Sequence, residues 1–171
     1  MVPRMRLRTC TCPSPIGPLR VAVDDAGRLV RLALPGDASL GEAPVHRRGD
    51  GCDEVVRQLD EYFAGRRRTF TLELAPSGTP FQHRAWQALQ QIPFGETRSY
   101  QQQAIAIGNA NATRAVGAAN GRNPIAIVVP CHRVIGKDRS LVGFGGGLEA
   151  KRWLLAHEAA VLAAGPVAQR A

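Results

Sequence analysis

The sequence contains no apolar run that approaches the roughly 20 residues needed for a membrane-spanning helix. The basic segment at residues 1–8 is not followed by the apolar core of a secretory signal. We therefore expect a cytoplasmic protein that does not act at a membrane and whose thiols stay reduced. Its 171 residues suffice for one medium domain or two small ones.

Cysteine is also scarce, with four residues at Cys10, Cys12, Cys52 and Cys131. The chain is too long, and its expected compartment too reducing, for a disulfide framework. The first three cysteines could form a zinc site with His46, but their spacing matches no common structural zinc pattern. The sequence therefore predicts free thiols and no bound metal or other cofactor.

Lysine is nearly absent, because Lys137 and Lys151 are the only lysines among 22 basic residues in a chain of net charge +8. A coding bias toward arginine explains this, but it does not explain the scarcity of acids in the second half. Residues 1–75 carry 12 basic and 10 acidic groups, whereas residues 76–171 carry 10 and 4. A cationic second half suggests a polyanionic partner such as nucleic acid.

The first half of the chain has the pattern of a small α/β unit. Apolar residues alternate with others over residues 19–23 and 30–34, and the turn residues between them predict a β-hairpin. The apolar spacing of residues 53–64, followed by Gly65, predicts a helix. Alternation over residues 70–74 predicts one more strand.

The second half has the pattern of a set of helices. Two capping boxes, at residues 79–82 and 99–102, predict the starts of two helices. Asn111 is the expected cap of a third helix over residues 112–120, and a tight glycine-asparagine turn before it predicts a helix-turn-helix. A last helix is predicted over residues 148–162.

The predicted third helix carries few side chains that could read a base sequence. Between residues 112 and 119 almost all side chains are small, and Arg114 is the only cation. A helix that reads base edges in the major groove normally carries arginine, asparagine or glutamine for that purpose. Small side chains would let the backbone approach a narrow minor groove, with Arg114 entering the base stack. The same composition also suits a helix packed tightly against a neighbour, and both interpretations remain open.

The densest concentration of reactive groups is the pair Cys131-His132. It ends an apolar segment whose backbone is restricted by Pro124 and Pro130, because residues before proline favour extended conformations. A thiol is a weak nucleophile until a neighbouring base or cation helps to form the thiolate. The pair is a candidate nucleophile and base, while a buried cysteine that packs as a small hydrophobic residue is the alternative.

Together, and in this order, these motifs resemble those of the O6-alkylguanine-DNA alkyltransferases. The resemblance runs almost continuously from Phe81 to Glu158. Its most specific segments are residues 114–117, 123–125, 130–136 and 145–147. The resemblance implies an α/β (α+β) protein with a ribonuclease-H-like N-terminal domain over residues 1–75. A mainly α, winged-helix-like domain with a helix-turn-helix would follow over residues 79–165.

By the same resemblance, Cys131 is the residue that accepts the alkyl group. His132 acts as a base through a bound water, and Glu158 orients its imidazole. Tyr100 donates a proton or hydrogen bond to the departing base, and Asn123 braces the turn beside the cysteine. The product is a thioether, so each protein molecule would repair one lesion.

The implied partner is double-stranded DNA that carries O6-alkylguanine or O4-alkylthymine, bound through its minor groove by a monomer. Arg114 takes the place of the flipped nucleotide. The other residues expected at the DNA are Ala112, Thr113, Ala115, Gly117 and Ala118. Those expected around the guanine are Val134, Phe144 and Gly145. A non-catalytic protein that binds alkylated lesions is the alternative, but the presence of Cys131 argues against it.

Two positions depart from the family pattern. Phe144 stands where many relatives carry tyrosine, so Tyr100 would carry more of the assistance to the leaving group. Gln103 stands where an apolar residue is usual, which raises the question of how the short helix that begins at residues 99–102 packs.

Overall fold

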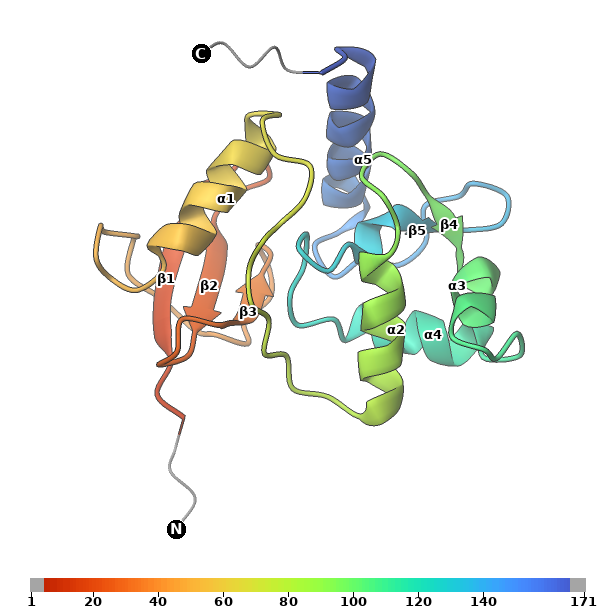
Figure 1. Cartoon of the computed structure of the whole chain (residues 1–171), viewed down its shortest axis with the longest axis horizontal. Helices are drawn as coiled ribbons and strands as arrows, with labels where there is room; N and C mark the ends of the chain where they lie inside the picture. Colours follow the sequence, from red (N-terminus) through yellow and green to blue (C-terminus); the bar gives the residue numbers. More distant parts are fainter. Residues whose placement is uncertain (1–4, 167–171) are drawn as a thin grey trace.

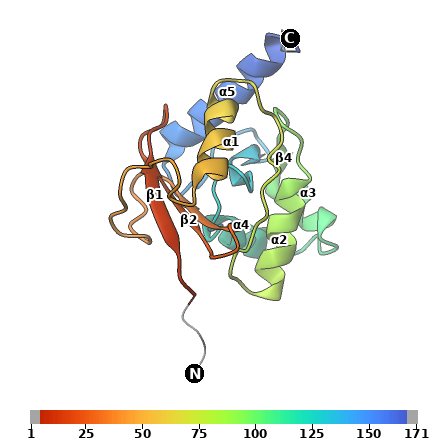
Figure 2. The ribbon, with the colours of Figure 1, turned by 60° about the vertical axis from the view of Figure 1, so that its left-hand side comes forward.

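The computed structural model describes residues 5–166, so residues 1–4 of the predicted N-terminal domain lie outside the described part. The N-terminal part contains an antiparallel sheet whose strands, in the order β1, β2, β3, are Arg8–Cys12, Leu19–Val23 and Leu29–Ala33. Helix α1, Asp53–Phe63, lies across this sheet (Figures 1 and 2). The predicted hairpin and helix are confirmed, and β1 is an additional strand that the alternation did not indicate.

The hairpin between β2 and β3 is closed by Asp24. Its side chain accepts the N–H of Arg28 at 2.9 Å and pairs with the guanidinium of the same residue at 2.8 Å. A register irregularity beside Val23 makes β3 begin at Leu29, one residue earlier than predicted. Leu29 is fully buried and Val30 only half-buried, so the start of β3 presents the opposite face to the core from the one predicted.

The predicted strand over residues 70–74 is wrong. This segment bridges to the sheet at Leu74, which lies opposite Leu29, and forms no regular strand. One reason is that the N–H of Thr71 donates to the side chain of Gln58 at 2.9 Å instead of to a neighbouring strand. The apolar residues of the segment still pack against the core, so the alternation marked burial correctly but not strand pairing.

The C-terminal part is mainly helical, as predicted. Its α-helices are α2 (Pro80–Gln90), α3 (Tyr100–Ala106), α4 (Thr113–Gly121) and α5 (Leu148–Ala163) (Figure 1). Both predicted capping boxes are confirmed, because Thr79 accepts the N–H of Gln82 and Ser99 accepts the N–H of Gln102, each at 3.1 Å. Among the helices of residues 5–166, none combines the length and apolarity that a bilayer crossing requires.

The predicted cap at Asn111 is wrong. Helix α4 begins after Ala112, which makes no side-chain capping bond. The side chain of Asn109 instead accepts the N–H of Asn111 at 3.2 Å, and its carbonyl accepts the N–H of Ala112 at 3.0 Å. This turn joins α3 to α4, which pack against each other and against α2 as a helix-turn-helix requires.

The N-terminal and C-terminal parts share one hydrophobic core. Leu32 in β3 donates its N–H to Pro124 O at 2.9 Å and accepts the N–H of Ala126 at 3.3 Å. The segment that leads to the reactive cysteine therefore extends the N-terminal sheet. Helix α5 is joined to α1 by a bond of 2.8 Å between His157 Nε2 and Tyr62 O.

Three short elements complete the fold. Strands β4 (Arg98–Ser99) and β5 (Val134–Ile135) form a two-stranded parallel sheet beside α3. The 3-10 helix η1, Cys131–Arg133, directly precedes β5 and contacts α5. The candidate nucleophile therefore lies where the helical part meets the N-terminal sheet.

Candidate active site

Cys131 follows a short, braced turn. Asn123 donates from Nδ2 to Val129 O at 2.7 Å and accepts the N–H of Ile125 at 3.0 Å. Ile127, within the turn, has a φ of 72°, a left-handed conformation that is costly for a β-branched residue. The N–H of Cys131 donates to Val129 O at 2.8 Å, so the segment braced by Asn123 also fixes the backbone of the cysteine.

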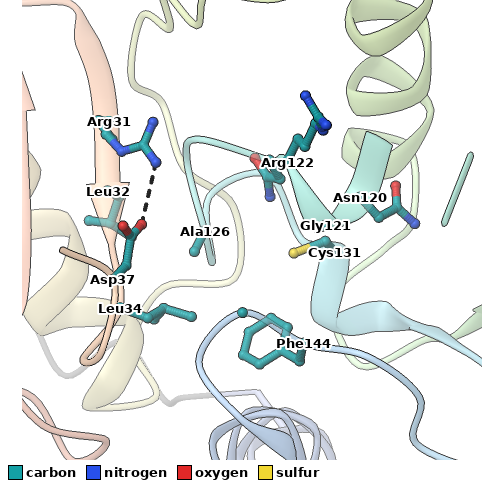
Figure 3. Close-up of a pocket in the computed structure, with 12 residues that line it drawn as sticks. Arg31, Leu32, Leu34, Asp37, Asn120, Gly121, Arg122, Ala126, Cys131 and Phe144 are labelled. Atoms are coloured by element: carbon teal, nitrogen blue, oxygen red, sulfur yellow. Dashed lines mark hydrogen bonds and ion pairs between the residues drawn. The ribbon is translucent and has the colours of Figure 1, made fainter. Parts of the chain in front are cut away.

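Two cavities meet at Cys131. The helix-side cavity, of about 430 Å³, lies between α3, α4 and the loop at residues 142–145. The sheet-side cavity, of about 320 Å³, extends toward Leu32 and Leu34 of the N-terminal part. Figure 3 shows the sulfur directed into the sheet-side cavity, toward Ala126. Cys131 is partly exposed, unlike the other three cysteines, so it is not a sealed packing residue.

A buried polar cluster lies directly behind this cysteine. Nε2 of His132 is 2.7 Å from Oε2 of Glu158, and both residues are fully buried. Arg133 donates from Nε to Oε1 at 2.8 Å and from Nη2 to Oε2 at 3.1 Å. The hydroxyl of Tyr62, from α1, donates to Oε2 at 2.7 Å. Donors on three sides therefore fix the carboxylate, and the carboxylate fixes the imidazole.

The cluster also sets the protonation of both groups. Burial disfavours the charge on Glu158, but the hydrogen bonds from His132 and Arg133, with the guanidinium charge, hold its pKa below the ordinary range. Burial lowers the pKa of His132, and the charges of Arg133 and Lys151 lower it further. The hydrogen bond to Glu158 acts in the opposite direction but does not cancel this shift. We therefore assign a neutral imidazole that donates Nε2–H to an ionised carboxylate. Its Nδ1 is a buried acceptor with no hydrogen-bond partner within residues 5–166.

The thiol of Cys131 needs help to ionise. Burial raises its pKa, while a hydrogen bond from Asn123, the charge of Lys151 and backbone N–H groups act in the opposite direction. Lys151 is fully buried, and its Nζ donates to Val134 O at 2.6 Å and to Val142 O at 3.0 Å. Burial lowers the pKa of Lys151, and the nearby sulfur opposes that shift. The site thus combines a protonated thiol, a base behind it and a buried cation whose field favours the thiolate.

Tyr100 lines the helix-side cavity at the start of α3. Its hydroxyl donates to Val142 O at 3.0 Å, the same carbonyl that accepts from Lys151. Burial raises the pKa of Tyr100, and negative charge at Cys131 would raise it further. Tyr100 therefore remains a proton donor at neutral pH beside the cavity that the sulfur borders.

The residues expected around the guanine fall into two groups. Phe144 and Gly145 line both cavities. Val134 is fully buried, and its backbone is already engaged: its N–H donates to Cys131 O and its carbonyl accepts from Lys151. Val134 thus lies behind the site and not at its surface.

Helix α4 has one exposed face and one buried face. Val116 and Ala119 pack inward. The residues on the outer side are Arg114, Ala115 and Ala118, which are exposed, and Thr113 and Gly117, which are half-buried. Ala112 is buried at the helix start. The small residues of α4 are therefore not all consumed by packing, which favours the interpretation of an open surface with a single cation.

Three side chains of the site were not among the predicted residues. Arg133 carried a signal, because it is a cation directly after Cys131-His132. Lys151 carried none, because it stands among other charged residues, Glu149 and Arg152, and only the structure shows that it is buried. Tyr62 carried none, because it reaches Glu158 from another helix, 96 residues earlier in the chain.

The polar residue at Gln103 is accommodated by a pair of amides. Gln103 is buried and donates from Nε2 to Asn120 Oδ1 at 2.9 Å and to Ala85 O at 3.1 Å. Asn120 donates back to Gln103 Oε1 at 2.7 Å. The reciprocal bonds satisfy both side chains and join α3 to α4 beside the helix-side cavity.

Comparison with known proteins places both halves of the chain. Residues 80–160 match the DNA-binding domain of 6-O-methylguanine DNA methyltransferase, and residues 7–76 match its ribonuclease-like domain. A methylated-DNA–protein-cysteine methyltransferase of Methanosarcina acetivorans is 48% identical over 144 residues, which cover 83% of this chain and 92% of that protein. A constitutive one from Bacillus subtilis is 45% identical over 151 residues, which cover 85% and 91%.

The fold leads to the same group of proteins. The crystal structure of Mycobacterium tuberculosis OGT in complex with DNA superimposes with a TM-score of 0.82 at 46% identity, covering 90% of this chain and 93% of that one. This agreement confirms the predicted fold class, an α/β N-terminal part followed by a mainly helical DNA-binding part. On sequence and fold together, the chain belongs to the methylated-DNA–protein-cysteine methyltransferase family.

Proposed function

We propose that this protein repairs double-stranded DNA by moving the alkyl group of O6-alkylguanine, or of O4-alkylthymine, to Sγ of Cys131. One observation carries the proposal: the partly exposed sulfur lies next to His132, whose Nε2 is held by Glu158 while Nδ1 remains a buried acceptor. A nucleophile, an oriented base and open cavities therefore meet at one point.

The transfer is a displacement at the alkyl carbon. Nδ1 of His132 takes the thiol proton through a bridging water, and Lys151 stabilises the thiolate until it attacks. The new carbon–sulfur bond forms as the carbon–oxygen bond to the base breaks, and the electron pair stays on the base. Tyr100 donates a hydrogen bond or proton to that base, which is left in the DNA as unmodified guanine. The thiol proton stays on His132 until solvent accepts it, and solvent returns a proton to Tyr100 where the phenol has given up its own.

Glu158 contributes by holding His132, and Asn123 by bracing the turn that carries Cys131. Both act on groups that the reaction uses, and their hydrogen bonds support this assignment. Phe144 cannot supply the hydroxyl that many relatives have, so Tyr100 is the phenol that assists the leaving group. Phe144 instead forms part of the wall of the cavity that receives the extrahelical base, and Gly145 presents its backbone to that base.

The DNA is bound at the exposed face of α4. Its small side chains let the backbone lie close to the minor groove, and Arg114 fills the space of the flipped nucleotide. Exposed cations near this face, such as Arg122 directly after α4, contact the phosphates. We further propose that the protein acts as a monomer in the cytoplasm. In this division of labour, residues 79–165 form the DNA-binding and acceptor domain and residues 1–75 support it.

Because the product is a thioether, the reaction ends with the protein alkylated and unable to act again. The test is incubation with a duplex that holds one O6-methylguanine, followed by mass spectrometry of the protein and its peptides. We expect one added methyl per molecule, on the peptide that contains Cys131. Methylated protein should not act on a second duplex.

Two variants make this test specific. Cys131→Ser should bind the lesion and gain no methyl, whereas Cys12→Ser, which removes a buried thiol that lines neither cavity, should gain one. Lesion binding without methylation of the unaltered protein would indicate the non-catalytic alternative. Repair of more O6-methylguanine lesions than there are protein molecules would contradict a single-use acceptor.

A further inference from the structure

A second group of reactive side chains lies in the N-terminal part, between β1 and the start of α1. The sulfurs of Cys10 and Cys52 and a carboxylate oxygen of Asp50 all lie within 4.8 Å of one another. Both cysteines are fully buried. Because β1 is separated from β3 by β2, this group is distinct from the alkyl-acceptor site.

The chain builds this group from two distant segments. Thr11 in β1 donates its N–H to Pro44 O at 2.7 Å and accepts the N–H of His46 at 2.8 Å, which fixes the preceding loop against the strand. Asp50 Oδ1 then accepts the N–H of Cys52 at 2.9 Å, a tight turn just before α1. The turn brings its carboxylate and thiol to the thiol of Cys10.

The carboxylate is also oriented from outside the group. Nδ1 of His46 lies 2.9 Å from Asp50 Oδ2, and the N–H of Arg47 donates to the same oxygen at 3.0 Å. Carboxylates that ligate a metal are themselves oriented by further hydrogen bonds, and His46 and Arg47 supply such bonds to Asp50. The other nitrogen of His46 lies 3.4 Å from Asp53 Oδ1, so the ring is held on both sides.

We propose that Cys10, Cys52 and Asp50 bind one zinc ion, with His46 orienting Asp50. Two thiolates and a carboxylate suit zinc, whereas magnesium and calcium prefer ligand sets made of oxygen. Binding replaces the two thiol protons, which are released to solvent, and forms two zinc–sulfur bonds. The spacing of these residues in sequence predicts no metal, because it does not show that the fold brings Cys10 and Cys52 together.

The ion would stabilise the N-terminal part. It would join β1 to the start of α1 and close the irregular loop at residues 35–51 between them. Since unfolded chain cannot present these ligands together, zinc would bind the folded state and raise its resistance to unfolding. Alkyl transfer at Cys131 would not require the metal as a reactant.

The test uses the full chain with Cys131→Ser, which removes the one partly exposed thiol as a source of metal binding. The reduced protein is unfolded, freed of metal and refolded with cobalt(II) as the probe. We expect one cobalt per chain, a thiolate-to-cobalt charge-transfer band in the near ultraviolet, and displacement of the band by zinc. Absence of the band, with the protein folded, would overturn the proposal.

Cys12 provides the matched control, because it lies on the same strand, is also buried and is not one of the three ligands. Cys10→Ser and Cys52→Ser should lose the band, and Cys12→Ser should retain it. Equal loss in all three variants would overturn the proposal.

A milder variant covers the case in which a serine variant fails to fold. Asp50→Asn keeps an oxygen for the N–H of Cys52 but removes the ligand charge, and it should weaken zinc binding by at least tenfold in competition with a chromogenic chelator. Unchanged affinity would contradict the assignment. Methyl transfer to Cys131 is measured separately on protein with that cysteine intact, so failure here leaves the alkyltransferase proposal standing.

Discussion

At the scale of single residues, the site depends on a carboxylate that is charged although it is buried. Glu158 tolerates its charge because Arg133 makes two hydrogen bonds to it and His132 and Tyr62 make one each. A buried charge with these partners is stable, whereas loss of one partner would leave a costly unpaired group. The acid, the base and their supports therefore act as one unit.

The neutral state of His132 has a consequence for stability. Burial lowers its pKa in the folded protein below the value near 6.5 of an unfolded chain, so the unfolded state binds the proton more readily. Stability should therefore fall as pH drops below about 6.5. Urea unfolding between about pH 8 and pH 5 should show this decline, and a His132→Gln variant should show a shallower one. Equal slopes for both proteins would contradict a neutral buried imidazole.

The field of Lys151 should be visible in the reactivity of Cys131. Lys151→Met retains the length of the side chain but removes the charge, so the pKa of Cys131 should rise. The pH profile for alkylation of Cys131 by iodoacetamide should shift upward by about one unit. Peptide mass spectrometry separates this cysteine from the three buried ones. Lys137→Met, at an exposed position, should leave the profile unchanged.

At the scale of elements, the outer face of α4 is the feature with the clearest function. Arg114→Ala should slow transfer from duplex DNA by roughly 10–100-fold, because flipping a nucleotide costs a few kcal/mol and the filler is lost. Transfer from the free base O6-methylguanine should be unaffected, since nothing is flipped. Single-turnover rates on both substrates provide the measurement.

Arg152→Ala is the matched control, because it removes an exposed arginine from α5. It should slow neither reaction. A loss on the free base in Arg114→Ala would show instead that the variant damages the site itself.

Elements were predictable where the signal is local. The capping boxes at Thr79 and Ser99 are complete within four residues, so the sequence was sufficient to predict both helix starts. The strand at residues 70–74 was mispredicted because Gln58, in another element, takes the N–H of Thr71. Pairing and capping that depend on distant partners leave no local pattern.

At the scale of the whole molecule, Tyr62 joins the N-terminal part to the acid of the active site. Tyr62→Phe removes the hydroxyl and keeps the ring, so a buried hydrogen bond to a charged group is lost. The free energy of unfolding should fall by about 1.5–3 kcal/mol. Urea unfolding should remain a single transition by both fluorescence and circular dichroism, because the two parts share one core.

Two separate transitions would contradict a shared core. Unchanged stability would show that the bond between Tyr62 and Glu158 contributes little. Methyl transfer by the same variant should slow, because Glu158 loses one of the donors that fix it.

The difference between local signals and distant partners also decides how much of the site the sequence could predict. Cys131 and His132 are adjacent, and the motif around them carries its own meaning. The contributions of Tyr62 and Lys151 exist only after folding, when Tyr62 of α1 reaches Glu158 and Lys151 of α5 reaches the carbonyl of Val134. A sequence motif can therefore identify the nucleophile and the base, whereas the side chains that set their orientation and pKa are found only from the packing of the folded protein.

The backbone pairing of Leu32 with the segment from Pro124 to Ala126 limits how this protein can be recombined with its relatives. A chimera that takes β3 from one parent and residues 124–126 from another joins two segments that did not evolve to pair with each other. We call this backbone pairing the seam between the two parts. Exchanges that keep both sides of this seam from one parent should yield active hybrids more often than exchanges made at the junction near residue 77, although that junction is the obvious place to cut.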